Sequence, residues 1–279
     1  MTKSEGFLYI ATGEKYIREA EDSARSLKKV RPDPEISLVT DRPYESSVFS
    51  NVKVIEWDPL EGDPRNDAGQ SKSGFAFKLE GLLASPYAKT IYVDTDMYFC
   101  EDVPELFELL DVFELLLCLD YFERSQIVLN GALINGCYPY QTGLIGFQRN
   151  ERSRKLFEIW KSVYRSEPDY WWGDQPALMA ALLRQDIRLH VLHSIYNFRF
   201  VTNVGFPQGE KVRLIHGRCA QKEFREVATR VNKTTENRVW VAVRRKCYSW
   251  TERNLIQRYA RRAYSAARRT ILGWARRLG

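Results

Sequence analysis

The sequence lacks long apolar runs. No acid-free stretch approaches the roughly 18 residues that cross a bilayer, and the most apolar segment, residues 106–119, is interrupted by Glu108, Asp111 and Glu114. Residues 1–6 are polar, without the apolar core and cleavage site of a signal peptide. A membrane-spanning helix is therefore not expected, and we expect a cytoplasmic protein.

Cysteine is scarce and shows no pairing pattern. The five Cys are widely and irregularly spaced, and no two of them have the close spacing of a zinc site. A disulfide framework and a zinc-binding module are thus excluded, and reduced, mostly buried thiols are expected. The chain also lacks internal repeats and low-complexity segments.

Acidic residues are almost missing from the C-terminal end. Residues 244–279 contain eleven Lys or Arg and a single acid, Glu252, which gives this segment a net charge of +10. Because the whole chain carries +6, the other 243 residues carry −4. The basic character therefore belongs to the end of the chain, and we divide it into a catalytic domain, 1–243, and a basic tail, 244–279.

The tail has the periodicity of an amphipathic helix. Projected at about 100° per residue, Tyr264 and Trp274 fall on an apolar face, and most Arg residues fall on the other. Such a helix suits the surface of an anionic membrane, and docking of its apolar face on the catalytic domain is the alternative. No nucleic-acid recognition motif accompanies the charge, so no nucleic-acid partner is expected.

Strand-like and helix-like segments alternate along the first half of the chain. This order is typical of βαβ units and predicts an α/β fold with a mostly parallel central sheet flanked by helices. The predicted strands are residues 7–11, 36–40, 52–57, 90–98, 115–119 and 212–216, together with short strands within residues 127–147. The predicted helices are residues 14–29, 75–83, 103–110, 151–164 and 174–184.

Two aspartates end an otherwise apolar segment. Asp94 and Asp96 are one residue apart, so on an extended chain their carboxylates point to the same side. Two hard oxygen donors at a strand end suit a divalent cation that also holds a diphosphate, and open α/β sheets bind ligands beyond the carboxyl ends of their strands. We therefore predict a metal and donor site here.

The Asp-x-Asp pattern alone is weak. Fourteen Asp among 279 residues give about 0.7 such triplets by chance. A helix-capping role for the pair is the plain alternative, but Glu101 and Asp102 already occupy the position before the next predicted helix. Acids within an apolar segment are costly to bury unless a cation or hydrogen-bond donors compensate, which favours the metal site.

Residues 78–99, KLEGLLASPYAKTIYVDTDMYF, resemble the aspartate-x-aspartate region of GT-A glycosyltransferases. The likeness is greatest to the retaining family 8, which includes glycogenin and bacterial lipopolysaccharide galactosyltransferases. It extends over residues 7–218, because weaker matches follow in the family's order. These matches are IATGEKY at 10–16, QTGLIGF at 141–147, WGDQP at 172–176, IYNF at 195–198 and LIHG at 214–217.

The resemblance implies a Mn²⁺ or Mg²⁺ site with His216 as third ligand beside Asp94 and Asp96. Imidazole is softer than the oxygen ligands that Mg²⁺ prefers, so this set favours Mn²⁺. Taken alone, a His at this late strand is more often an ordinary core or surface residue. The cation would stabilise the charge that develops on the leaving diphosphate.

The resemblance also implies where the nucleotide-sugar donor binds. Ala11, Thr12 and Tyr16 would cradle the base and ribose, Asp41 would touch the base, and Thr95 would contact the donor. Uridine is the favoured base, and guanosine is the alternative. An equally good account of Asp41 is that it opens a turn after its strand.

Four further residues are implied at the donor's phosphates and sugar. Lys78 would point to the phosphates or else be an exposed helix lysine. Gly143 would lie beside the donor sugar, Asp174 would bond its hydroxyls or cap the following helix, and Gln175 would lie under the anomeric carbon.

The chain departs from the family pattern at two positions. Gly13 stands where an acid is common, and Gln141 stands where Asn is usual. Tyr170, Trp171 and Trp172 either pack internally or stack on a sugar.

The acceptor is predicted to be a glycan or a lipid-linked glycan, with peripheral contact to the inner membrane face through the tail. Three alternatives stay open. An inverting enzyme would need a base such as Asp169 or Glu167. A sugar-phosphate nucleotidyltransferase would need a Gly-rich basic loop after the first strand, which residues 12–15 represent poorly. The third is a non-catalytic module that acts through its tail.

Overall fold

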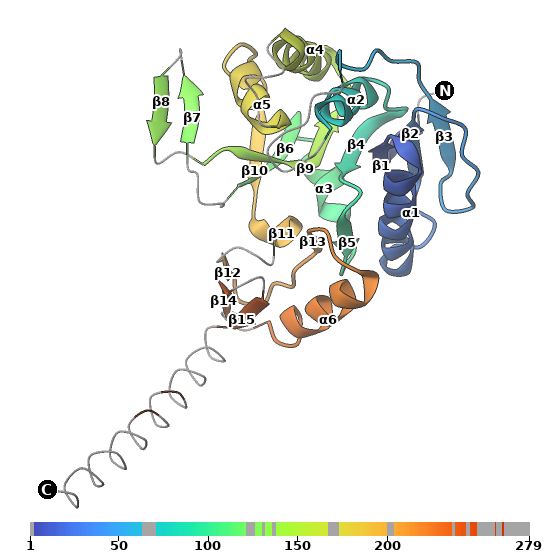
Figure 1. The fold of residues 1–279 in the computed structure, drawn as a ribbon. Coiled ribbons are helices and arrows are strands. Elements are labelled where there is room, and N and C mark those ends of the chain that lie inside the picture. Colours follow the sequence, from blue (N-terminus) through green and yellow to red (C-terminus); the bar gives the residue numbers. More distant parts are fainter. Residues whose placement is uncertain are drawn as a thin grey trace, which may run out of the picture. The chain divides into compact units, whose positions relative to one another are not determined.

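A computed structural model shows the fold of the chain (Figure 1). Two compact units are present, residues 1–199 with 211–234 and residues 200–210 with 235–279, and each is described by itself. The structure describes residues 3–62, 71–120, 126–129, 132–135, 138–166, 173–199, 204–235, 238–243, 246–249, 260 and 264.

A seven-stranded sheet, in the order β10-β6-β9-β4-β1-β2-β3, forms the centre of the first unit. β9 runs antiparallel to both β4 and β6, and every other neighbouring pair is parallel. The predicted mostly parallel α/β sheet is therefore confirmed. The strands are β1 (Lys3–Ala11), β2 (Ile36–Thr40), β3 (Asn51–Val54), β4 (Tyr87–Val93), β6 (Leu115–Leu119), β9 (Tyr140–Gln148) and β10 (Leu189–Leu192).

Helices cover both faces of this sheet because its central strands are apolar on both sides. Successive side chains of a strand point to opposite faces. Phe7 and Tyr9 of β1 pack with α1 and α3, whereas Leu8 and Ile10 pack with α2, α4 and α5. The helices are α1 (Gly13–Val30), α2 (Lys72–Leu83), α3 (Pro104–Leu109), α4 (Glu151–Ser166), α5 (Asp174–Leu182) and α6 (Gln221–Val231).

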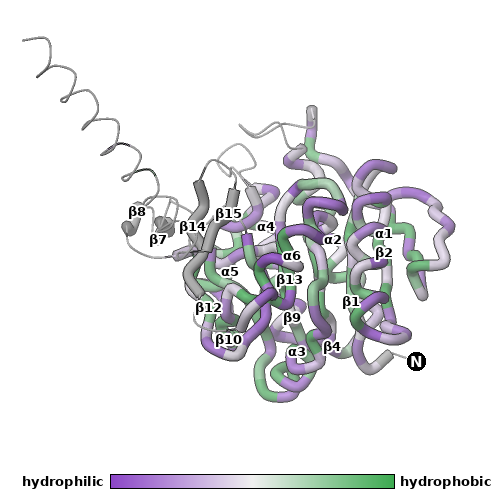
Figure 2. Tube along the Cα trace, turned by 90° about the horizontal axis from the view of Figure 1, so that it is seen from below, coloured by the Kyte–Doolittle hydropathy of each residue, from purple (hydrophilic) through white to green (hydrophobic). Residues whose placement is uncertain are grey.

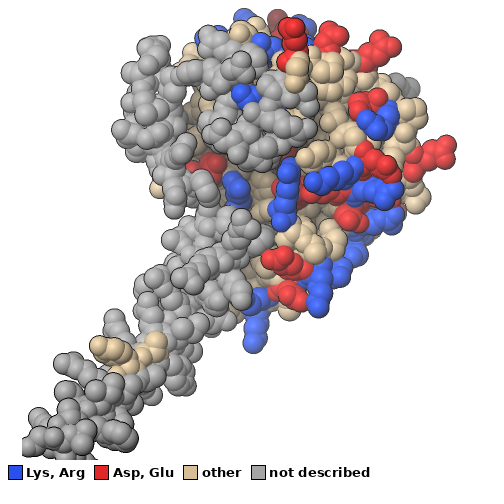
Figure 3. Space-filling model, viewed as in Figure 1, with Lys and Arg blue, Asp and Glu red and all other residues tan. Residues whose placement is uncertain are grey.

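α1, α4 and α6 are amphipathic, whereas α2 and α5 are largely buried and lack a distinct polar face. Hydrophilic and hydrophobic residues alternate along the tube in Figure 2. In α1 the predicted apolar positions Ile17, Ala20, Ala24 and Leu27 are all fully buried. On the face in Figure 3, acidic and basic side chains intermingle over the described surface. That part of the surface therefore shows no large patch of one sign.

A second, three-stranded sheet of the first unit has the order β11-β13-β5. β5 (Met97–Phe99) pairs antiparallel with β13 (Leu214–His216), and β11 (Phe198–Arg199) pairs parallel with β13. His216 lies opposite Met97 in this register. The sheet therefore brings a late segment of the chain next to the two aspartates. The 3₁₀ helix η1 (Ser194–Tyr196) leads into β11.

The predicted strand over residues 90–98 is wrong in one respect that matters for the site. β4 ends at Val93, residues 94–96 form a turn, and β5 starts at Met97. The two aspartates therefore do not share one face of an extended strand. The chain leaves the large sheet here because β5 pairs with β13 instead, and this tertiary pairing decides where the two carboxylates lie.

Two smaller β structures complete the described chain. β7 (Gln126–Leu129) and β8 (Ala132–Asn135) form an antiparallel pair. In the second unit, β14 (Arg238–Val243) pairs antiparallel with β12 (Val204–Phe206) and with β15 (Lys246–Ser249).

β15 corrects the expectation that the tail is helical from residue 244 onward, because strand pairing with β14 fixes residues 246–249. The rest of the predicted tail helix lies outside the described residues, apart from Ala260 and Tyr264, which are helical and exposed. None of the described helices is both long enough and apolar enough to span a membrane. The domain division at residue 243 stays a prediction.

Gly81 lets α2 approach the sheet closely. A Cβ atom built there would lie 2.6–2.8 Å from three side-chain carbons of Ile10, so Gly81→Ala forces the helix and β1 apart. We expect this substitution to lower the free energy of unfolding by about 1–3 kcal/mol, measured by urea unfolding.

Gly74 in the same helix is the matched control, because a Cβ there would meet only Ser71 Oγ, at 4.0 Å. Gly74→Ala is expected to stabilise the protein by up to about 1 kcal/mol through helix propensity. Equal effects of the two substitutions would contradict the close packing of α2 on β1.

Candidate active site

A cavity of about 380 Å³ lies where β1 and β4 end at their carboxyl termini. This is the edge at which open α/β sheets bind ligands. The cavity is lined by every predicted site residue except Asp41. Those residues are Ala11, Thr12, Tyr16, Lys78, Asp94, Thr95, Asp96, Gly143, Asp174, Gln175 and His216.

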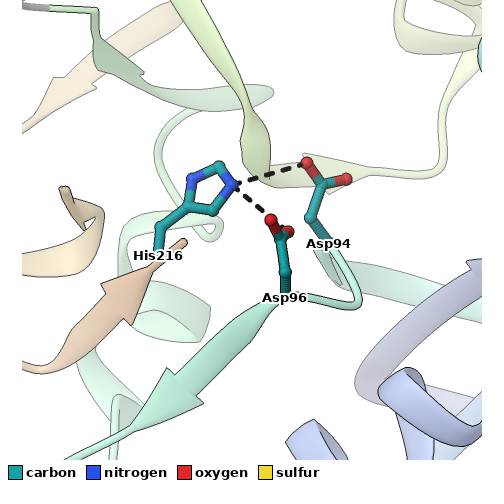
Figure 4. Close-up of side chains that lie close together, drawn as sticks. All are labelled: Asp94, Asp96 and His216. Atoms are coloured by element: carbon teal, nitrogen blue, oxygen red, sulfur yellow. Dashed lines mark ion pairs between the residues drawn. The ribbon is translucent and has the colours of Figure 1, made fainter. Parts of the chain in front are cut away.

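Asp94, Asp96 and His216 form a compact group of potential metal ligands (Figure 4). One ligand atom from each lies within 4.8 Å of the others. His216 Nε2 is 3.3 Å from Asp96 Oδ1 and 4.0 Å from Asp94 Oδ2. The group therefore combines carboxylate oxygens and one imidazole nitrogen, a donor set that suits a divalent cation.

Lys78 is buried, which excludes the alternative of an exposed helix lysine. Its Nζ lies 3.3 Å from Asp94 Oδ1, 2.9 Å from Asp174 Oδ2 and 2.6 Å from the carbonyl oxygen of Thr142. The Nζ donates hydrogen bonds to Asp94 Oδ1 and to the Thr142 carbonyl oxygen, and it forms an ion pair with Asp174 Oδ2. Nζ also lies 4.9 Å from the centre of the Tyr92 ring.

Opposite charges decide the pKa of Lys78. Burial by itself lowers the pKa, but the carboxylates of Asp174 and Asp94 outweigh this and raise it. Burial raises the pKa of Tyr92 well above its ordinary value, and the charge of Asp94 adds to this effect. Lys78 is therefore a cation at neutral pH, and Tyr92 is a neutral phenol that donates its hydrogen bond to Asp94 Oδ1.

Asp96 faces His216 on one side and Arg218 on the other. Burial by itself raises the pKa of the Asp96 carboxyl, but His216 and then Arg218 reverse this and lower the pKa to about 2. Arg218 Nε is 3.7 Å from Asp96 Oδ2, and the guanidinium lies 5.3 Å from the centre of the Tyr16 ring. Arg218 thus adds a half-exposed cation to the cavity.

Because position 143 is a glycine, the side chains of His216 and Asp94 can lie close together. A Cβ atom at this position would lie 2.6 Å from His216 Cε1, 2.8 Å from His216 Nδ1 and 3.3 Å from Asp94 Oδ2. The carbonyl oxygen of Gly143 also accepts a hydrogen bond from the backbone N–H of Asp94 at 2.8 Å. Gly143 therefore anchors the turn and leaves space for the imidazole.

Asp174 and Gln175 begin α5, and Gly173 is the residue at the N-cap. The alternative in which Asp174 caps this helix is therefore wrong. Asp174 Oδ1 accepts a hydrogen bond from Thr142 Oγ1 at 3.0 Å, and its backbone oxygen accepts one from Trp160 Nε1 at 2.9 Å. No donor among the described residues reaches the buried Gln175 Oε1, which leaves an acceptor at the cavity wall.

Asp41 lies outside the cavity lining and serves the chain turn. Its Oδ1 accepts a hydrogen bond from the backbone N–H of Gly13 at 3.1 Å, and Arg42 pairs with both carboxylate oxygens. Gly13 has φ +74°, a left-handed conformation that favours glycine. This geometry favours glycine at position 13, where the family pattern predicted an acid.

Some residues that line the cavity or contact its lining were not predicted from the sequence. Tyr92 is two residues from Asp94, and this spacing is the only sequence signal for its contact. Glu19 accepts a hydrogen bond from Thr95 Oγ1, and burial raises the pKa of Glu19. Glu19 and Arg218 reach the site through tertiary structure alone, and no local pattern marks them. The predicted residues Glu167, Asp169 and Tyr170–Trp172 lie outside the described residues.

Comparisons with known proteins agree with this fold. The family model described as nucleotide-diphospho-sugar transferase matches residues 84–255. The fold resembles the galactosyltransferase LgtC crystallised with donor and acceptor sugar analogues, at 17% identity and a TM-score of 0.54 over 81% of this chain and 96% of that one. The fold also resembles a glutamine-to-glutamate active-site mutant of LgtC. The identity is 18% and the TM-score is 0.56, over 82% of this chain and 95% of that one.

Among curated proteins, none matches the sequence. At the identities of the solved structures, the likeness establishes the fold, and the family model establishes the family. The predicted resemblance to GT-A transferases is confirmed by both. The chain belongs to the nucleotide-diphospho-sugar transferase family and is a glycosyltransferase with the GT-A fold.

Proposed function

We propose that this glycosyltransferase moves a hexose from a UDP-sugar to a glycan or lipid-linked acceptor, with Mn²⁺ as cofactor and with retention of the anomeric configuration. The observation that carries the proposal is the cluster of Asp94, Asp96 and His216, whose ligand atoms lie within 4.8 Å of one another inside the cavity. Mg²⁺ as the cation and GDP-sugars as donors are the alternatives.

The donor set supports a cation of intermediate softness. Two carboxylates alone suit Mg²⁺ and Mn²⁺ equally, whereas the imidazole of His216 favours Mn²⁺. When bound, the cation would neutralise charge on the leaving diphosphate. Asp94, Asp96 and His216 would hold the cation. Their neighbours Tyr92, Lys78 and Arg218 add a hydrogen-bond donor and two positive charges.

Arg218 is placed to meet the donor's phosphates. Its side chain is half-exposed and has one weak ion pair, at 3.7 Å to Asp96. A guanidinium offers a fork of N–H donors that matches phosphate oxygens. We propose that Arg218 binds the diphosphate, and that Tyr16 beneath it borders the nucleoside with Ala11 and Thr12.

Lys78 acts in a different way. Because its ammonium already contacts Asp94, Asp174 and the Thr142 carbonyl, we propose that it holds the Asp94 and Asp174 carboxylates in place. Its positive charge would also attract the donor phosphates through space, since a buried charge is weakly screened. Asp174 and Gln175 would face the sugar, with the unpartnered Gln175 Oε1 available to a hydroxyl or to the anomeric centre.

Retention rests on the family resemblance and on the neutral side chain of Gln175 in the cavity lining. Gln175 is a neutral amide, so attack by the acceptor on the same face as the departing phosphate, with that phosphate as base, is consistent with the residues described. An inverting enzyme would instead need a carboxylate such as Asp169 or Glu167 near the acceptor.

We propose that the protein works in the cytoplasm and that its basic tail contacts the inner membrane face.

The proposed donor site predicts that Mn²⁺ and a UDP-sugar bind together. A ligand at 100 times its dissociation constant adds about 2.7 kcal/mol of stability, so a UDP-sugar should raise the melting temperature with Mn²⁺ and much less with EDTA. Replacing a residue that only holds a metal ligand in place typically weakens metal binding by about 10–100-fold. Asp94→Asn and Asp96→Asn should therefore weaken Mn²⁺ binding by more than about 100-fold.

Asp186→Asn is the control for these variants, because Asp186 is exposed and does not line the cavity. It should bind Mn²⁺ and the donor as the wild type does. If GDP-sugars raised the melting temperature more than UDP-sugars do, the choice of uridine as the base would be overturned. Donor binding that is the same with EDTA would overturn the metal-dependent mechanism.

Gly143→Ala tests the close approach of His216. The added Cβ would displace the imidazole from the two aspartates, so we expect the Mn²⁺ dissociation constant to rise by about 10–100-fold while circular dichroism stays unchanged. Gly205→Ala, where a Cβ meets no atom within 4 Å, should have no effect on Mn²⁺ binding. Wild-type Mn²⁺ affinity in Gly143→Ala would mean that His216 is not a ligand.

A further inference from the structure

His216 is held from the side that faces away from the aspartates. Its Nδ1 lies 2.8 Å from Asn197 Oδ1, whereas its Nε2 points to Asp94 and Asp96. A neutral imidazole has one N–H and one lone pair. The partner of Nδ1 therefore decides whether Nε2 has a lone pair for a cation or carries the proton.

Asn197 is itself held by a third side chain. Its Nδ2 donates a hydrogen bond to Gln141 Oε1 at 3.2 Å, and both residues are buried, with 6% and 2% of their surface exposed. With the amide nitrogen directed to Gln141, the amide oxygen is directed to His216. In the opposite orientation the amide nitrogen would face Nδ1 and place the ring proton on Nε2, where it would block a cation.

The backbone keeps Asn197 at this place. Asn197 follows η1, and its N–H donates to the Ser194 carbonyl oxygen at 3.2 Å. The next residues form β11, which pairs with β13 so that Arg199 lies beside His216. Asn197 and His216 are thus on neighbouring segments of one small sheet, a rigid base for a hydrogen bond between side chains.

We infer that Asn197, oriented by Gln141, is a positioning residue that keeps the His216 proton on Nδ1 and so presents the Nε2 lone pair to the cation. The inference rests on the proposed function, since it deepens the metal site. It also gives a physical role to Gln141, whose side chain reaches Asn197 and accepts its hydrogen bond.

The test measures Mn²⁺ affinity by electron paramagnetic resonance in the 279-residue chain. Asn197→Leu has a similar shape but no acceptor, and its dissociation constant should rise by about 10–100-fold, the usual cost of losing a partner of a ligating His. Asn197→Asp keeps an oxygen acceptor for Nδ1–H, and the Gln141 amide can turn to donate to it. This variant should therefore bind Mn²⁺ at least as tightly as the wild type.

Two further variants separate positioning from loss of structure. Gln141→Leu leaves Asn197 in place but releases its amide, so its loss of affinity should be smaller than that of Asn197→Leu. Asn232 makes two hydrogen bonds to the backbone of Val212 and lies outside the cavity lining. Asn232→Leu should lower the melting temperature and leave Mn²⁺ affinity unchanged.

The outcomes distinguish this inference from the proposed function. If the wild type binds no Mn²⁺, the proposed function and the inference both fail. If the wild type binds Mn²⁺ and Asn197→Leu binds it equally well, the inference alone fails. Equal losses in Asn197→Leu and Asn197→Asp would also overturn it, because the acceptor would then not be what matters.

Discussion

Three carboxylates, those of Asp94, Asp96 and Asp174, come together at the carboxyl end of β4, and the compensation of their negative charge is the constraint on which the site depends. Carboxylates shielded from water are costly unless cations or hydrogen-bond donors compensate them. Lys78 lies between Asp94 and Asp174, at 3.3 and 2.9 Å, and it compensates that pair. Within the part of the chain that the structure describes, the cationic or imidazole groups beside Asp96 are His216 and the more distant Arg218.

The fold uses two sheets to hold this charge. The large sheet delivers Asp94 at the end of β4 and Gly143 on β9 beside it, joined by a backbone hydrogen bond of 2.8 Å. The small sheet delivers His216 on β13, opposite Met97 of β5. Asp94 and Asp96 lie in the turn between the two sheets, so a shift of either sheet would separate the carboxylates from the imidazole. The absence of a side chain at Gly143 permits the contact.

Much of this arrangement could be predicted from the sequence, for identifiable reasons. β2 and β6 begin and end where their apolar runs do, and the buried face of α1 follows from the spacing of Ile17, Ala20, Ala24 and Leu27. The motifs that resemble the GT-A family placed eleven predicted residues in one cavity. Such motifs work because each is a short segment whose position in the fold is shared with relatives.

The parts that could not be predicted depend on contacts between distant segments. Residues 90–98 look like one apolar strand, and only the pairing of β5 with β13 shows that the chain turns at Asp94. Lys78 is identifiable by its position, but its burial between two carboxylates depends on how closely α2 packs on β1. Glu19 and Arg218 reach the site through tertiary contacts that no local pattern shows. Asn197 lies in the IYNF segment, 195–198, but its contact with His216 depends on the pairing of β11 with β13.

The most direct test of the account is a crystal of the protein grown with UDP and Mn²⁺, with diffraction data collected at the manganese absorption edge. The account predicts an anomalous peak within bonding distance of Asp94, Asp96 and His216 Nε2, in contact with the diphosphate. A peak bound only by phosphate oxygens, or one bound through His216 Nδ1, would contradict it.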